Sequence, residues 1–147
     1  MAALHYFAFG SNLHGARLSE RAPSARALGP ARLEGFRLCA DKRSSDGSGK
    51  LNLARDAAAS VWGVAFRIEP EDLAALAGFE PGYLQIGVSV QLRGGGALAA
   101  TTFLSEQRAA GLCLQPGYRE LVIAGAREHA LPAEWIELLE RLPVATG

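Results

Sequence analysis

The chain has 147 residues, 49% of them hydrophobic, which is enough for one domain with its own core and too short for two ordinary domains. We therefore expect residues 1–147 to form a single domain. Fifteen Lys and Arg residues balance fifteen Asp and Glu residues, so charge gives no support to binding of nucleic acid or of an anionic membrane surface. No apolar run approaches the roughly 20 residues of a membrane-spanning helix.

The predicted elements begin with a buried strand that stops at Gly10, followed by a short helix that Pro23 ends. Alternating bulky residues predict further strands, and three glycines at 94–96 supply the turn between the last two. Pro70 opens a helix at its tolerated first position. In chain order, strands are expected at 5–9, 27–33, 36–41, 51–54, 60–68, 83–92 and 97–104, and helices at 13–21, 71–77, 118–127 and 132–142.

Within the connection 42–50, the residues 44–49 have no apolar periodicity. Its serine, aspartate and glycine residues are typical of a mobile connection between strands. Loops of this composition sometimes close over a site, so the sequence leaves open whether this one is a lid or a plain connection.

Strands dominate the middle of the chain and helices gather at its end, without the regular alternation of a doubly wound sheet. This order predicts an α+β fold. The last helix carries an apolar face that includes Trp135 and Leu139. Such a face covers either the core of its own chain or a second copy of the chain. The sequence is therefore compatible with both a monomer and a homodimer.

The two cysteines, Cys39 and Cys113, are expected to be buried thiols rather than a disulfide or metal ligands, because they lack a C-x-x-C spacing. The first twelve residues have no basic start and no long apolar segment, so no secretory leader is expected and a cytoplasmic location fits best. The histidines His5, His14 and His129 are scattered, which argues against a metal site.

Familiar nucleotide and hydrolase motifs are also missing. Residues 49–51 lack the earlier glycine and the following hydroxyl of a phosphate-binding P-loop, and no G-x-G-x-x-G follows a strand. No G-x-S-x-G nucleophile elbow occurs either. We therefore expect no cofactor and no metal, and chemistry that needs only a carboxylate and hydrogen-bond donors remains.

The most informative segment is 6–13, where an apolar strand stops at small hydrogen-bonding residues. Gly10 allows positive φ and close backbone approach, while Ser11 and Asn12 can donate side-chain hydrogen bonds or cap a following helix. Converging N–H groups in such a concavity suit a carboxylate, or an oxyanion developing on a carbonyl. The same residues also make an ordinary strand-to-helix turn.

Glu80 is the candidate catalytic carboxylate, because it sits between Phe79 and Pro81 after a helix and before a strand. Partial burial among apolar neighbours raises a carboxyl pKa and makes the group a better proton acceptor. A solvated loop glutamate is the alternative. Tyr118 follows Pro-Gly at 116–117, where a tyrosine either packs or offers its hydroxyl to a ligand.

Four segments in chain order carry a family resemblance: Y-F-A-F-G-S-N-L at 6–13, V-W-G-V at 61–64, L-A-G-F-E at 76–80, and G-A at 125–126 followed by L-P at 131–132. They resemble motifs of the gamma-glutamylcyclotransferase (AIG2-like) family, whose first motif reads Y-F-A-Y-G-S-N-L. The resemblance implies a small closed or nearly closed mixed β-barrel with flanking helices and a cavity at one mouth. It spans most of the chain.

The resemblance also implies an activity: the α-amine of a γ-glutamyl group attacks its own γ-carbonyl, forms 5-oxoproline and expels the attached amine, without a cofactor. Glu80 corresponds to the family's catalytic glutamate, which moves both protons. The implied substrate-binding residues are Tyr6, Phe7, Ala8, Phe9, Gly10, Ser11, Asn12 and Tyr118. The implied partner is a small molecule, a γ-glutamyl amino acid or amine.

Two departures stand at central positions. Phe9 lacks the hydroxyl of the family's second tyrosine, and Pro81 follows Glu80 where glycine is usual, within a segment that is shorter than in many relatives. These departures motivate an alternative, a non-catalytic binding or interaction module on the same fold. A cytosolic amide hydrolase is a third interpretation, but the sequence offers no obvious second acid or metal for it.

Overall fold

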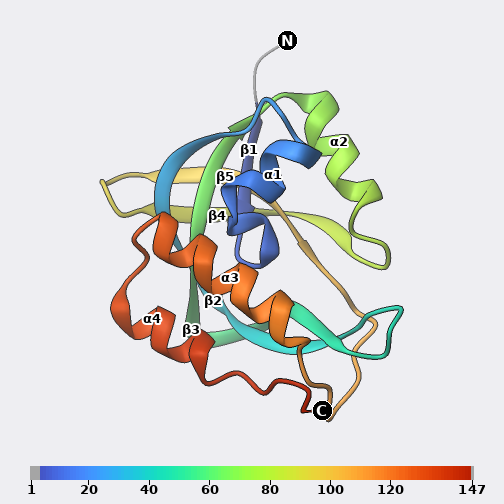
Figure 1. Cartoon of the computed structure of the whole chain (residues 1–147). Helices are drawn as coiled ribbons and strands as arrows, with labels where there is room; N and C mark the ends of the chain where they lie inside the picture. The colour runs from blue at the N-terminus through green and yellow to red at the C-terminus, as the bar shows by residue number, and fades with distance from the viewer. Residues whose placement is uncertain (1–3, 147) are drawn as a thin grey trace.

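A computed structural model describes residues 4–146 of the chain. Its strands and helices follow each other as the sequence patterns predict, with shifted bounds (Figure 1). The strands are β1 (Leu4–Ala8), β2 (Arg26–Arg43), β3 (Gly49–Ile68), β4 (Leu84–Leu92) and β5 (Ala97–Leu104). The helices are the 3-10 turn η1 (Ser11–Leu13), α1 (Gly15–Arg21), α2 (Pro70–Gly78), α3 (Pro116–Glu128) and α4 (Ala133–Glu140).

The strands form a closed barrel in the order β1-β3-β2-β4-β5. Neighbouring strands run antiparallel, except where β1 meets β5 in parallel through the pair Tyr6 and Thr101. The hydroxyl of Thr102 donates to the carbonyl oxygen of Phe7 at 2.7 Å and joins the same two strands inside the protein. The expected α+β fold, a small mixed barrel with flanking helices, is confirmed.

The two longest strands replace shorter predicted ones. The strands expected at 27–33 and 36–41 are one strand, β2, because Gly35, with φ 87°, carries a bulge between Glu34 and Phe36 and pairing with β3 continues beyond it. The strands expected at 51–54 and 60–68 likewise merge into β3. Glycine tolerates the positive φ that such a bulge requires.

The predicted loop over 42–50 is a turn at 44–48, and the prediction is wrong at its two ends, 42–43 and 49–50, which belong to strands. Strand β2 extends to Arg43 and β3 starts at Gly49, so only a tight turn separates them. The turn is closed by a 2.8 Å hydrogen bond from the N–H of Ser44 to the carbonyl of Ser48. At the two ends of the segment, backbone pairing between β2 and β3 outweighs the local composition: Lys42 pairs with Lys50, and Arg43 pairs with Gly49.

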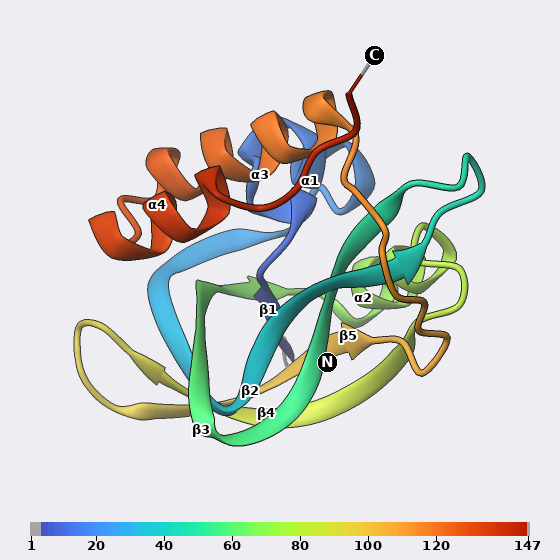
Figure 2. The same ribbon diagram turned by 90° about the horizontal axis from the view of Figure 1, so that it is seen from below.

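Helices α1, α3 and α4 lie together on one side of the barrel, as Figure 2 shows. Gly125 of α3 packs directly on the turn η1, since an added Cβ there would lie 2.4 Å from the backbone carbon of Leu13. Trp135 and Leu139 of α4 are buried within the chain itself. The core of the barrel is formed by fully buried side chains such as Phe7, Leu53 and Val64. This packing fixes η1 at one end of the barrel.

Candidate active site

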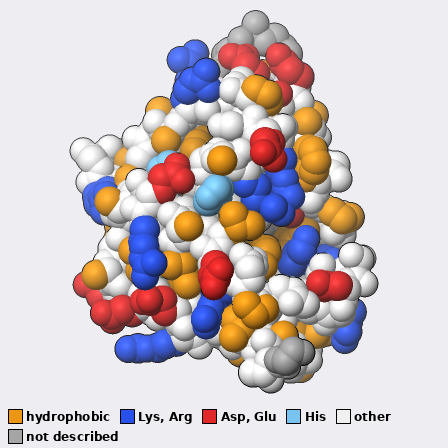
Figure 3. Space-filling model, in the orientation of Figure 1, with side chains coloured by type: hydrophobic (Ala, Val, Ile, Leu, Met, Phe, Trp, Pro, Cys, Tyr) orange, Lys and Arg blue, Asp and Glu red, His pale blue; other side chains and the backbone are white. Residues whose placement is uncertain are grey.

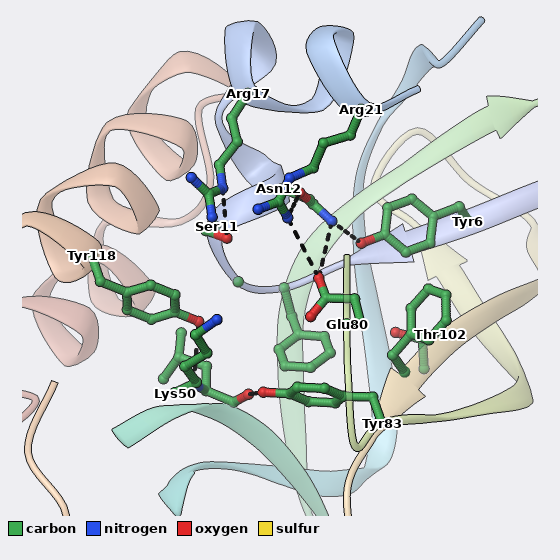
Figure 4. Close-up of a pocket in the computed structure, with 14 residues that line it drawn as sticks. Tyr6, Ser11, Asn12, Arg17, Arg21, Lys50, Glu80, Tyr83, Thr102 and Tyr118 are labelled. Carbon is green, nitrogen blue, oxygen red and sulfur yellow. Dashed lines mark hydrogen bonds and ion pairs between the residues drawn. The ribbon is translucent and has the colours of Figure 1, made fainter. Parts of the chain in front are cut away.

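A small pocket opens where η1, α1 and α3 meet the end of the barrel (Figure 4), and the space between its lining atoms, open solvent at the mouth included, is about 450 Å³. Side chains from distant parts of the sequence converge on it. Glu80 stands near the centre of the view, with α1 above it and α3 to the left. The lining residues are Tyr6, Phe9, Gly10, Ser11, Asn12, Arg17, Arg21, Lys50, Leu51, Glu80, Tyr83, Thr102, Phe103 and Tyr118.

The turn η1 forms one wall of the pocket. The N–H of Leu13 donates to the carbonyl of Gly10 at 3.0 Å, and that of His14 donates to the carbonyl of Ser11 at 3.1 Å. Gly10 adopts φ −115°, so the positive φ expected for it is not used. A Cβ added to Gly10 would lie 3.4 Å from the Tyr118 hydroxyl, which is an ordinary contact, so the backbone of this glycine directly borders the pocket.

Glu80 is held by partners from the signature segment and from α1. The amide of Asn12 donates to Glu80 Oε1 at 3.4 Å and to the Tyr6 hydroxyl at 3.0 Å. Arg21 Nη1 donates to Asn12 Oδ1 at 3.2 Å and lies 3.8 Å from Glu80 Oε1. Asn12 therefore bridges the carboxylate, the guanidinium and a tyrosine, and this arrangement sets the direction in which the carboxylate points.

The Glu80 side chain retains only 18% of its exposure. Burial raises its pKa above the ordinary value of 4.5, while the charges of Arg21, Lys50, Arg17 and Lys42 act in the opposite direction. Burial disfavours the charged form of the carboxyl group, and its effect on the pKa exceeds the opposite effect of the four cations. The outcome is a carboxylate with more basic character than a surface glutamate, next to a cavity that can admit a ligand.

Three tyrosine hydroxyls face or border the pocket. The Tyr118 hydroxyl accepts from the N–H of Leu51 at 3.2 Å, and the Tyr6 hydroxyl accepts from Asn12. Each therefore keeps its own proton to donate elsewhere. The Tyr83 hydroxyl instead donates its proton to the carbonyl oxygen of Leu51 at 2.8 Å. Burial raises the pKa of all three, so they are donors at neutral pH.

Most of the predicted site residues come together in this pocket, and two do not. Phe7 and Ala8 are completely buried in the barrel and do not line the cavity. Phe7 points to the strand face opposite to that of Tyr6, because successive residues of a strand alternate in direction. The Phe9 ring does line the cavity, so the hydroxyl it lacks would have been at or near the site.

Sequence reasoning missed several residues of the pocket. Arg17 and Arg21 are four residues apart on α1 and share one face of the helix, a spacing that is common on ordinary surface helices. Arg17 Nε donates to the Ser11 hydroxyl at 3.1 Å. Lys50 stood in the segment expected as a loop, and Tyr83 reaches the pocket only because the chain turns at 80–83. The i,i+4 arginine pair after the signature segment was the available signal.

Residues 4–146 contain no group of three or more His, Cys, Asp or Glu side chains arranged to hold a metal ion. Among the same residues, no helix has the length and apolar character needed to span a bilayer.

Comparisons with known proteins agree with this geometry. The model of the AIG2-like family matches residues 60–139. Gamma-glutamylcyclotransferases from Homo sapiens and Mus musculus are each 30% identical to the chain, over 93% of the chain and 77% of their own length. A solved structure named gamma-glutamyl cyclotransferase superposes with a TM-score of 0.90 at 28% identity, covering 99% of this chain and 90% of that one. This homology supports an enzyme with cyclotransferase activity, and the chain belongs to the AIG2-like, gamma-glutamylcyclotransferase family.

Proposed function

We propose that the protein releases 5-oxoproline from small γ-glutamyl amides, with Glu80 as the general acid and base and without a cofactor. One observation carries the proposal: a largely buried carboxylate of raised pKa shares a small pocket with tyrosine hydroxyls that are free to donate. These are the groups that an intramolecular acyl transfer needs.

In the proposed reaction Glu80 takes a proton from the α-ammonium of the bound γ-glutamyl group. The freed amine attacks the γ-carbonyl carbon, a carbon–nitrogen bond forms, and negative charge develops on the carbonyl oxygen. Glu80 then gives this proton to the departing nitrogen while the original amide bond breaks. The ring nitrogen loses its second proton to Glu80, which passes it to the released amine, so that 5-oxoproline and an ammonium ion result. Each proton transfer by a positioned group contributes about 10²- to 10⁴-fold to the rate.

The remaining polar groups have roles that fit the charges of such a substrate. In this proposal the hydroxyls of Tyr6 and Tyr118 stabilise the oxyanion, and Arg17 with the turn at 10–12 binds the α-carboxylate. Holding the glutamyl chain folded supplies several kcal/mol more, because an oriented intramolecular attack avoids an entropic cost. Phe9 closes the cavity on its apolar side.

The proposal is tested by assaying 5-oxoproline release from a panel of γ-glutamyl amides with Glu80→Gln. The amide of glutamine keeps the hydrogen-bonding shape but cannot accept the ammonium proton, so we expect kcat to fall by at least about 10²-fold. Glu120→Gln, at an exposed position of α3 outside the pocket, is the matched control and should retain full activity. Equal turnover by Glu80→Gln and the parent would remove the catalytic assignment.

The two alternatives have their own signatures in the same assay. Ligand binding without turnover by any panel member would favour a non-catalytic module, which Phe9 at the pocket wall motivates. Glutamate in place of 5-oxoproline would indicate an amide hydrolase. Glu80 is the one carboxylate among the residues that line the pocket, which leaves a hydrolytic water without a second acid.

The proposal also covers the domain organisation, the size of the substrate, the cellular location and the oligomeric state of the protein. A single domain over residues 1–147, a small-molecule substrate and a cytoplasmic location remain predictions from the sequence, and a homodimer stays open. Size-exclusion chromatography with light scattering would determine the number of chains in solution.

A further inference from the structure

Asn52 is a completely buried polar side chain that the proposed chemistry does not use. Charged side chains lie at the surface of the molecule, as Figure 3 shows for the face that carries α1 and α3. Asn52, on β3, lies inside instead and does not line the pocket, whereas its chain neighbour Leu51 does. A buried polar group is stable only where its hydrogen bonds are made, so the partners of Asn52 indicate its role.

The side-chain amide of Asn52 makes four hydrogen bonds. Its Oδ1 accepts from the N–H of Ser105 at 2.8 Å and from the N–H of Leu53 at 2.9 Å. Its Nδ2 donates to the carbonyl of Ser105 at 3.0 Å and to Asp41 Oδ1 at 2.9 Å. The amide thus bonds both backbone groups of Ser105, as a neighbouring strand would, and ties β3 to the segment after β5. Its whole hydrogen-bonding capacity is used.

Arg108 extends this network to the surface. Its Nη1 donates to Asp41 Oδ2 at 3.1 Å, and its Nη2 donates to the carbonyl of Leu53. The N–H of Ala109 donates to the carbonyl of Asp41 at 2.8 Å. Strands β2 and β3 and the segment after β5 are therefore joined around Asn52.

Leu51 is the point at which this network meets the site. Its N–H donates to the Tyr118 hydroxyl at 3.2 Å, and its carbonyl accepts from the Tyr83 hydroxyl at 2.8 Å. In Figure 4 both hydroxyls point to the stretch of β3 that carries Lys50. The chain has only three tyrosines, and all of them line the pocket. One residue of β3 therefore orients two of the three.

The regular ladder between β2 and β3 does not fix Leu51. The register shifts between Cys39 and Lys42 of β2, which is the stretch opposite Leu51. Such an irregularity locally disrupts the hydrogen bonds of a ladder. Two anchors flank Leu51 instead: the N–H of Gly49, bonded to the segment before α3 at 2.8 Å, and the side chain of Asn52.

We propose that Asn52 is a positioning residue for the reaction, because it holds Leu51 where that residue orients the Tyr118 hydroxyl toward the substrate. The inference rests on the proposed function, in which Tyr118 stabilises the oxyanion. The N–H of Leu51 occupies a lone pair of the Tyr118 oxygen, so the hydroxyl proton is directed away from the strand and into the pocket. A donor that is already oriented stabilises developing charge without reorganising during the reaction.

The test places a carbon isotope label at Cζ of the tyrosines, the ring carbon that bears the hydroxyl, and records their NMR signals in Asn52→Ala. Replacing each tyrosine in turn by Phe assigns the three signals. We expect the signals of Tyr83 and Tyr118 to move, because their hydrogen bonds to Leu51 change. The signal of Tyr6 should stay, because its hydroxyl bonds Asn12 on a different element.

Val61→Ala is the matched control. Val61 is completely buried at a distant position of the same strand and does not line the pocket, so this variant loses stability through a cavity in the core. It should leave all three tyrosine signals and kcat unchanged.

Arg108→Gln is a second, milder variant, since Arg108 is exposed and none of the four bonds of Asn52 involves it. Its loss loosens Asp41 and Leu53, so the signals of the same two tyrosines should move in the same direction by a smaller amount. If Asn52→Ala does not fold, Arg108→Gln decides the test in its place, and unmoved signals of both tyrosines there overturn the inference.

Kinetics separate positioning from a general loss of structure. We expect kcat for 5-oxoproline release to fall about tenfold in Asn52→Ala with KM nearly unchanged, because a misplaced oxyanion donor acts on the transition state. In a Tyr118→Phe background the same substitution should lower kcat less than about twofold, because the hydroxyl that Asn52 positions is already absent. Equal falls in the two backgrounds would show that Asn52 supports the fold and not the hydroxyl.

Failure of this inference is distinguishable from failure of the proposed function. If all three tyrosine signals move together in Asn52→Ala, or if none moves, Asn52 does not position the site, whether or not the protein is active. If the parent protein releases no 5-oxoproline from any γ-glutamyl amide, the cyclotransferase proposal fails, while the tyrosine signals still decide whether Asn52 holds Leu51 and its two tyrosines in place.

Discussion

At the scale of single residues, the proposed chemistry depends on how burial and nearby cations together set the pKa of Glu80. Burial raises the pKa of the carboxyl, and Arg21 is the first of the cations that lower it. A carboxylate with no cation nearby would be protonated too readily to act as a base, and a fully paired one would be too weak a base. The amide of Asn12 positions the carboxylate between these limits.

Replacing Arg21 with Gln should move the acid limb of the pH–rate profile to higher pH. Burial already places the pKa of Glu80 above 4.5, and Arg21 lowers it, so removing the guanidinium raises the pKa further. The active form is the deprotonated one, hence activity at acidic pH is lost first. We expect the limb in log kcat/KM to shift by a few tenths of a unit to about one unit, because the pair is partly exposed.

The control for this measurement is Arg26→Gln, an exposed arginine at the start of β2 that lies outside the pocket. It should leave the acid limb where it is. An acid limb that stays in place or moves to lower pH in Arg21→Gln would contradict the assigned role of the guanidinium, whatever happens to the maximal rate.

The sequence located the carboxylate but not the charges around it. Glu80 was found because its segment resembles a family motif, whereas burial alone could not be read from its neighbours. Arg17 and Arg21 point into a pocket only because α1 is turned toward the barrel end by η1, and this orientation is a property of the folded chain. A pair of arginines on a short helix otherwise predicts a solvated face.

At the scale of elements, the position of the site depends on how α3 packs on η1. The turn η1 has only three residues and cannot hold its shape alone. The close approach at Gly125 holds α3 against it, and the same helix carries Tyr118, which lines the pocket. One contact between two elements therefore sets two walls of the site.

Gly125→Ala should destabilise the protein and impair activity. The added Cβ would lie 2.4 Å from the carbon of Leu13 and 2.5 Å from the nitrogen of His14, both backbone atoms, so α3 and η1 must separate. We expect a loss of about 1–3 kcal/mol in the free energy of unfolding, measured by urea denaturation, and a fall in kcat/KM.

Gly117→Ala in the first turn of the same helix is the matched control. Nothing lies within 4 Å of its added Cβ, and alanine is the better helix former, so this variant should be neutral or slightly more stable. Equal stability of the two variants would show that the close approach at Gly125 does not constrain the packing of α3.

Element prediction succeeded where periodicity was strong and failed at glycines inside strands. The hairpin partner at 97–104 was predicted with its observed bounds. Gly35 instead interrupts the apolar pattern, and a single sequence cannot distinguish a bulge from the end of a strand. The same ambiguity extended the expected loop to 42–50, although its two ends belong to β2 and β3 and only 44–48 form the turn.

At the scale of the whole molecule, barrel closure joins the first strand to the last. The β1–β5 contact is parallel and links residues almost a hundred positions apart, so no local pattern encodes it. The expectation of a barrel came from the family resemblance, while composition and periodicity gave only the α+β class. Closure matters for function, because Tyr6 on β1 and Thr102 on β5 line the same pocket.

Thr102→Val should weaken this closure. The Thr102 hydroxyl is completely buried and donates to the carbonyl of Phe7, and valine keeps the branched shape while it removes the donor. We expect the free energy of unfolding to fall by about 1–2 kcal/mol, because a single buried hydrogen bond is lost. The slope of this free energy against urea concentration should change little, because the surface exposed on unfolding is the same.

Thr101→Val is the control, since that side chain is only half-buried at the adjacent position of β5, and its effect should stay within about 0.5 kcal/mol. A Thr102→Val protein as stable as this control would mean that the parallel pairing at Tyr6 and the core around Phe7 close the barrel without the hydroxyl.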